Sequence, residues 1–141
     1  MTSFADNYRT KDTWVSGSPT DIPFVLLVER IPLPMLLHRA RVSVNHADGK
    51  EGVIGAVLYP GEFVAAARLV ADKLAPSLCK DSVFSVIAEQ IEGAADILQD
   101  ETQDPGQGCD AISIGLGFEA GPATLGGPLD RPAEEDPCSA P

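Results

Sequence analysis

The sequence is poor in basic and aromatic residues and has no long hydrophobic run. Only 6% of the residues are aromatic, and 10 Lys and Arg stand against 21 Asp and Glu, which gives a net charge of -11. The longest apolar stretch near the N-terminus, Phe24–Val28, is far too short to span a bilayer. An acidic chain repels nucleic acid and anionic membranes at long range. Partners of both kinds are therefore disfavoured.

Cysteine is scarce as well. Cys79, Cys109 and Cys138 are odd in number, lie about thirty residues apart and form no C-x-x-C pair. This pattern argues against a disulfide framework and against a structural zinc site. No charged segment leads into an apolar run at the N-terminus, so no signal peptide is predicted. By elimination we expect a cytoplasmic, reducing location, and we expect no metal and no other cofactor.

What remains is an ordinary globular composition with an uneven charge. The 141 residues are 44% hydrophobic, which is enough for one domain with a real core. Residues 1–98 hold 12 acids and 9 bases, whereas residues 99–141 hold 9 acids and one base. Residues 105–141 are also rich in Gly and Pro. The sequence therefore predicts a polar arm (1–21), a domain (22–119) and a flexible acidic tail (120–141).

Three strands are predicted in the first half of the domain. Phe24–Val28 is a short apolar run, which Pro32 and Pro34 should end because proline donates no hydrogen bond to a neighbouring strand. Residues 36–46 alternate between apolar and polar side chains, as a half-buried strand does. Asp48-Gly49 is a strong signal for a two-residue turn, and residues 53–59 form the return strand.

A two-residue turn would fix the register of this hairpin. Val44 would face Val53, His38 would face Tyr59, and His46 would face Glu51. The segment Pro32-Leu33-Pro34 has two interpretations: a corner between strands, which is favoured, or a proline segment that binds a partner.

Two helices and a last strand are expected to complete the fold. The first helix has an apolar stripe at Phe63, Ala67, Val70 and Leu74, with an Arg68–Asp72 pair on its exposed side. The second helix begins at Asp81, carries apolar residues from Phe84 to Leu98 and should dock on the sheet. Alternation from Ile112 to Phe118 predicts another strand. The expected fold class is α+β, with a mostly antiparallel sheet of about four strands, the order β-β-β-α-α-β and two helices on one face.

Two candidate sites for small ligands are weak. Gly115 to Ala120 fits the spacing of a dinucleotide fingerprint, but Gly and Pro follow where that motif needs a helix. His46 opposite Glu51 would be a candidate pair for acid–base chemistry. No nucleophile is placed near it, so no catalytic residue is assigned. The alternative is a strand-end ion pair for His46 and a packed His38 beside Tyr59.

Two charged patches are candidate binding surfaces. Arg30, Arg39, Arg41 and Lys50 form the one basic patch, which could hold phosphates of a nucleic acid or another anionic ligand. Stacking aromatics are missing there, and acids of the tail or of the second helix could neutralise the arginines. Glu89, Glu92, Asp96 and Asp100 form an acidic stripe on the second helix. Such a stripe is a solvated face or a docking surface for a basic partner.

Three classes of function remain open on these grounds. The favoured class is a non-enzymatic protein that binds another protein, as a regulator, adaptor, inhibitor or assembly factor, with a second copy of the chain as a further partner. The alternatives are an anion or nucleic-acid binder at Arg39 and Arg41, and a small enzyme at His46 and Glu51.

Overall fold

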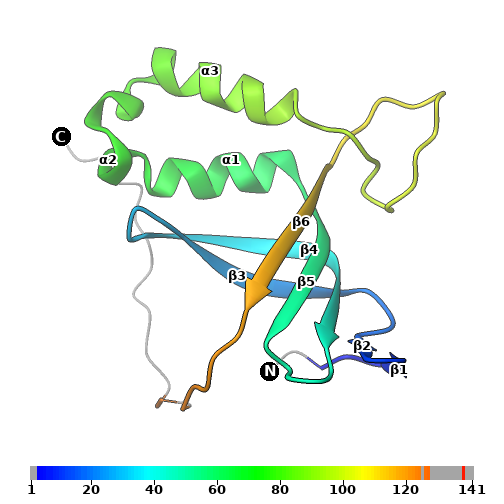
Figure 1. Ribbon diagram of the computed structural model, residues 1–141. Coiled ribbons are helices and arrows are strands. Elements are labelled where there is room, and N and C mark those ends of the chain that lie inside the picture. The colour runs from blue at the N-terminus through cyan, green and yellow to red at the C-terminus, as the bar shows by residue number, and fades with distance from the viewer. Residues whose placement is uncertain (1–2, 125, 128–137, 139–141) are drawn as a thin grey trace.

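A computed structural model describes residues 3–124, 126–127 and 138 (Figure 1). The elements follow in the order β1 (Tyr8–Thr10), β2 (Thr13–Val15), β3 (Thr20–Val28), β4 (Ile31–Asn45), β5 (Glu51–Leu58), α1 (Pro60–Leu69), α2 (Ala71–Leu74), the 3-10 helix η1 (Pro76–Cys79), α3 (Asp81–Glu92) and β6 (Ile112–Glu119). The α+β class and the antiparallel sheet are confirmed. In the described part of the chain the sheet has six strands rather than four, in the order β1-β2-β4-β5-β6 with β3 on β4.

The two additional strands come from the segment expected to be a loose arm. β1 and β2 form a small hairpin, and Trp14 of β2 pairs with Val44 of β4. The Trp14 ring also contacts Phe4 edge-on and donates a hydrogen bond to Asn7. Ser16 is fully buried, and its hydroxyl accepts a hydrogen bond from the N–H of Val42. These contacts fix the arm, which composition alone described as polar and loose.

β3 and β4 are joined by a tight hairpin instead of a proline corner. Glu29 and Arg30 both have positive φ, at 50° and 73°, and turn the chain directly from Val28 to Ile31. Pro32 and Pro34 lie inside β4. Along residues 31–37, β4 pairs with β3 alone. The missing N–H groups of the two prolines would point to the other edge of β4, where no strand needs a hydrogen-bond donor, so the prolines are tolerated.

The register predicted for β4 and β5 is wrong by one residue. The connection spans residues 46–50, and the side chains of Asn45 and Asp48 accept hydrogen bonds from backbone N–H groups within it. Val53 therefore pairs with Ser43 instead of Val44. A slip of one residue moves a side chain to the other face of the sheet, and Val53 is accordingly 51% exposed.

The main core forms where β4 bends. The β4–β5 register shifts between His38 and Arg41, and Arg39 has a φ of 51°, which marks a β-bulge. The bend brings the β3–β4 hairpin across β5 and β6 (Figure 1). The buried cluster there consists of Leu37, Ala40, Ala56 and Leu58, with Ile22, Phe24 and side chains of β6 packed against it.

The helices do not both cover the sheet. α1 lies alongside the unpaired half of β4, where Ala66 and Val70 pack on Leu33 (Figure 1). α3 packs on α1 and η1 and contains no buried residue. It ends at Glu92, because Gly93 forms its C-cap, and does not continue to Leu98. The predicted docking of the second helix on the sheet is wrong. None of the described helices has the length and apolar character to cross a membrane.

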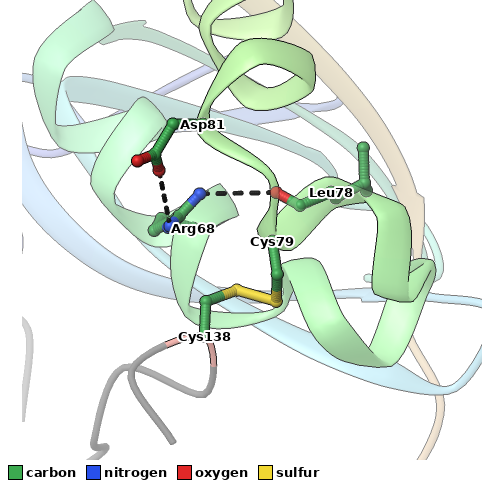
Figure 2. Close-up of a disulfide and its surroundings, with 5 residues drawn as sticks. All are labelled: Arg68, Leu78, Cys79, Asp81 and Cys138. Atoms are coloured by element: carbon green, nitrogen blue, oxygen red, sulfur yellow. Dashed lines mark hydrogen bonds and ion pairs between the residues drawn. A yellow bond between two sulfur atoms is a disulfide. The ribbon is translucent and has the colours of Figure 1, made fainter. Parts of the chain in front are cut away.

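An ion pair joins α1 to α3, and a disulfide joins η1 to Cys138. Arg68 pairs with Asp81 at 3.2 Å rather than with Asp72, and its guanidinium donates to the carbonyl of Leu78 (Figure 2). Cys79 is bonded to Cys138, with a Cα–Cα distance of 5.1 Å. The inference from cysteine spacing against disulfides is therefore wrong, since 59 residues separate the two partners and no local motif marks them. Most of the predicted tail, namely residues 125, 128–137 and 139–141, lies outside the described residues.

The disulfide should contribute measurably to stability. A cross-link over 59 residues restricts the unfolded chain by about 4 kcal/mol in the chain-entropy model. We expect Cys138→Ser to lower the free energy of unfolding in urea towards that amount. Cys109→Ser is the matched control, because Cys109 is an exposed free thiol. Equal stability of the two variants, or the absence of a linked Cys79–Cys138 peptide in a non-reducing digest, would contradict the bond.

Two glycines of β5 test the register directly. A Cβ at Gly52 would collide with the Phe118 ring and with the carbonyl of Ser43, whereas a Cβ at Gly55 meets nothing within 4 Å. We expect Gly52→Ala to cost about 1–3 kcal/mol through overpacking. Gly55→Ala should leave stability nearly unchanged. Thermal and urea unfolding of both variants measure this difference, and a reversed ranking would show that the register is wrong.

Candidate functional site

One face of the β3–β4 hairpin is entirely apolar. Pro23 pairs with Leu36, Val25 with Pro34 and Leu27 with Pro32. Paired residues share a face of an antiparallel sheet, and so do alternate residues along one strand. The six side chains therefore form one surface, called the proline face below: Pro23, Val25, Leu27, Pro32, Pro34 and Leu36.

The proline face is uncovered because the core uses the other face of the hairpin. Phe24 and Met35 alternate with its residues and pack into the core, and Leu33 packs on α1. Val25 is 43% exposed and Leu27 is 67% exposed. Sequence reasoning interprets Pro32-Leu33-Pro34 as a corner between strands or, less favoured, as a proline segment that binds a partner. It does not join these prolines with Val25 and Leu27 into one surface. The signal that could have found it is the pair of unbroken apolar runs, residues 22–28 and 31–37, on the two sides of Glu29-Arg30. A hairpin of two such strands is apolar on both faces.

A cavity of about 290 Å³ opens at the margin of this face. Pro23, Pro34 and Leu36 line one side, and residues around the start of α1, among them Tyr59, Glu62 and Phe63, line the other. Glu62 is in the first turn of α1, where its negative charge interacts favourably with the helix dipole. The cavity is apolar apart from this carboxylate and the tyrosine, a composition common in binding pockets.

His38 is held next to this cavity by contacts on three sides. Its ring stacks on Tyr59 with a centroid distance of 3.8 Å. Nε2 lies 2.8 Å from a carboxylate oxygen of Glu62, and Nδ1 lies 3.4 Å from one of Asp21. The His38 side chain is 9% exposed, whereas both carboxylates are 55% exposed. The predicted packing of His38 beside Tyr59 is confirmed. In the sheet, however, His38 pairs with Val57, which lies two positions before Tyr59 and on the same face.

The geometry of this cluster favours a structural role for His38. Both ring nitrogens are already occupied by carboxylates of the chain itself, and the ring has little contact with solvent. The accessible polar atoms are therefore those of Glu62 and Asp21. A ligand entering the cavity would meet apolar walls and an acidic group, so the site is suited to an apolar group that carries a positive charge.

The structure divides the predicted basic patch. Arg39 and Arg41 both pair with Glu101, at 3.3 Å and 2.7 Å. Arg30 lies at the β3–β4 turn and Lys50 in the β4–β5 connection, at opposite ends of β4. The neutralising acid comes from the segment between α3 and β6, where composition gave no reason to single it out. An anion would have to compete with Glu101 for both arginines.

The acidic stripe is also divided. Glu89 and Glu92 are exposed on α3, but Asp96 and Asp100 follow the end of that helix. The Asp96 carboxylate accepts hydrogen bonds from the hydroxyl and the N–H of Ser113, and these bonds lower its pKa below 3.8. The hydroxyl and N–H of Thr102 lower the pKa of Asp100 in the same way. Both aspartates thus hold the segment before β6 in place through hydrogen bonds.

In the described part of the chain, no hydrogen bond or ion pair joins His46 and Glu51. His46 lies in the connection after β4, where its N–H donates to the carbonyl of Asp12. Glu51 begins β5 and pairs with Glu119 of β6. In the observed register His46 is no longer opposite Glu51, and the predicted pair depended on that position. Among residues 3–124, 126–127 and 138, no group of three or more His, Cys, Asp or Glu side chains could hold a metal ion.

Comparisons of the chain with protein-family models, with curated proteins and with solved structures found no match. Its function must therefore be inferred from its own surfaces.

Asp96 gives a test of how the segment before β6 is held. Its pKa is lower in the folded protein than in the unfolded chain, so its contribution to stability is present above pH 3.8 and is lost as the pH falls through the lowered value. We expect Asp96→Asn to destabilise the protein at neutral pH, with the difference from wild type shrinking below pH 3.8. Urea unfolding across this range measures it. Asp12→Asn controls for the loss of one charge, and equal pH profiles for both variants would contradict the assignment.

Proposed function

We propose that this chain is a non-enzymatic protein-binding domain, and that the proline face is its contact surface. The observation that carries the proposal is the exposure of an uncharged, apolar sheet face on a small acidic protein. Exposed apolar patches on soluble proteins mark interaction sites. Leu27, the most exposed of its large side chains, lies next to the hairpin turn, where a partner has access.

The structure also supports a kind of partner. The proline face leads into the cavity that Glu62 helps to line, and Asp21 contacts the other nitrogen of the His38 ring. An apolar segment of a protein that carries Lys or Arg would bury the proline face and place its charge near Glu62. The net charge of -11 favours the approach of such a basic partner. Glu89 and Glu92 on α3 add to this long-range attraction without belonging to the contact surface.

The proline face is rigid, which makes it more suitable for binding a partner. Three of the six residues are prolines, which have little conformational freedom to lose when a partner binds. The hairpin is held from behind by the core through Phe24 and from its side by α1. Binding would therefore cost little reorganisation of this chain.

The alternatives have weaker support. Binding of nucleic acid or another anion at Arg39 and Arg41 would require the displacement of Glu101 from both side chains. An enzyme at His46 and Glu51 would require a contact that the described structure does not contain. A second acid–base candidate, His38, has both nitrogens occupied by carboxylates.

Affinity capture from lysate of the source organism, followed by measurement with the purified partner, tests the proposal. Wild-type protein would first identify a stoichiometric partner, whose dissociation constant is then compared for a Val25→Ser plus Leu27→Ser variant. We expect the affinity to fall at least about tenfold, because exposed apolar anchors carry much of an interface's energy. Both side chains are exposed, so the fold should be retained.

Val86→Ser is the matched control, since it removes a 52% exposed valine from α3. It should bind the partner as wild type does. A truncation after Thr124 keeps β6 intact but removes the Cys79–Cys138 disulfide. Its affinity is therefore compared with that of Cys138→Ser, to show whether the segment beyond Thr124 takes part. The proposal fails if no stoichiometric protein partner is captured, or if the double variant and Val86→Ser bind equally well.

A further inference from the structure

β6 is the last strand of the sheet, and part of its edge is unpaired among the residues that the structure describes. It pairs with β5 alone in the main sheet, and the N–H of Ala120 donates to the carbonyl of Lys50. In an antiparallel pair, hydrogen-bonded positions alternate with positions whose N–H and C=O point away. The even-numbered residues of β6 therefore bond to β5. The odd-numbered residues direct their backbone groups outward.

The beginning of this edge is covered by the chain itself. The Asp96 carboxylate binds the outward N–H of Ser113, and Ile97 forms an isolated bridge with Ala111. Among the described residues, no hydrogen bond reaches the outward groups of Gly115, Gly117 and Glu119. The open edge is thus a defined stretch, residues 115–119.

The other sheet edges carry features that discourage pairing, and this one does not. β1 has only three residues. β3 contains Pro23, which interrupts the row of donors. β6 contains no Lys, Arg or Pro and no bulge in its pairing with β5. Edges without such protection pair readily with another strand.

We propose that residues 115–119 pair antiparallel with the same residues of a second copy of this chain, about a two-fold axis at Gly117. Gly117 then faces Gly117 of the other copy, and Gly115 faces Glu119. These are the positions with outward N–H and C=O groups, so the three pairs can exchange six hydrogen bonds. This contact is separate from the proline face and goes beyond the proposed function.

The side chains of this segment are complementary to themselves in that register. Leu116 falls opposite Phe118 of the second copy at a position without hydrogen bonds, where side chains approach most closely. Both are half-buried on the core side of the sheet, so pairing would extend the apolar core across the two copies. The one charged residue, Glu119, faces a glycine rather than another acid. On the outer side the glycines leave nothing to obstruct the second strand.

The charge of the chain sets how the association should respond to salt. Each copy carries a net charge of -11, and the two repel one another. Salt screens this repulsion over about 8 Å at physiological ionic strength. A short strand-to-strand contact is also small, so the dimer should be weak and should depend on concentration.

Sedimentation velocity of the full chain over a concentration series, at low and high salt, tests the proposal. We expect the weight-average mass to rise from monomer towards dimer, and to rise further with added salt. Gly117→Pro removes the outward N–H at the two-fold axis without removing a bond to β5. Gly117→Lys places two like charges opposite each other. Each should weaken the dimer by about tenfold or more.

Gly55→Lys is the matched control. A Cβ on Gly55 or on Gly117 would meet no atom within 4 Å, and Gly55 lies on an interior strand. It should dimerise as wild type does, as should the Val25→Ser plus Leu27→Ser variant. Hydrogen exchange should show protection at Gly115, Gly117 and Glu119 that grows with concentration. A monomer at every concentration and salt, a dimer unaffected by both Gly117 variants, or protection confined to another strand would overturn the proposal.

Discussion

The bend in β4 is the constraint on which the rest of the structure depends. This one strand pairs with β3 in its first half and with β2 and β5 in its second. The bulge between His38 and Arg41 changes its direction. Leu37, just before the bulge, and Ala40, within it, are fully buried. Without the bend, the β3–β4 hairpin could not cross β5 and β6 to close the core.

The same bend creates both of the surfaces proposed for binding. Because the hairpin turns one face to the core, the opposite face leaves Val25 and Leu27 exposed, and the proline face results. Because β5 begins to pair with β4 only at His38, the first half of β4 has an unpaired side, which α1 covers. At the other end of the sheet no element of the described chain plays the part of α1, and the edge of β6 is open among these residues.

Some features of the chain followed directly from local patterns. The alternation in β4 and β6 predicted both strands, and the apolar spacing after Pro60 predicted α1. The packing of His38 beside Tyr59 was also predicted, since the two lie on one face under either register. The register itself depended on the length of the turn after Asn45, where side-chain hydrogen bonds favoured a longer connection. The disulfide was missed because Cys79 and Cys138 are far apart in sequence and no local motif marks them.

The sequence by itself determined the α+β class, the antiparallel pairing of β4 with β5 and the acidic character of the chain, because periodicity, turn residues and charge are local or additive properties. The tertiary structure alone decided which apolar face stayed exposed, which acid neutralised Arg39 and Arg41, and where α3 packed. Those outcomes depend on contacts between residues far apart in the chain. Glu101 illustrates the reason. No neighbouring residue in the sequence marks it, and it reaches both arginines because the segment that precedes β6 lies beside β4 in the folded chain.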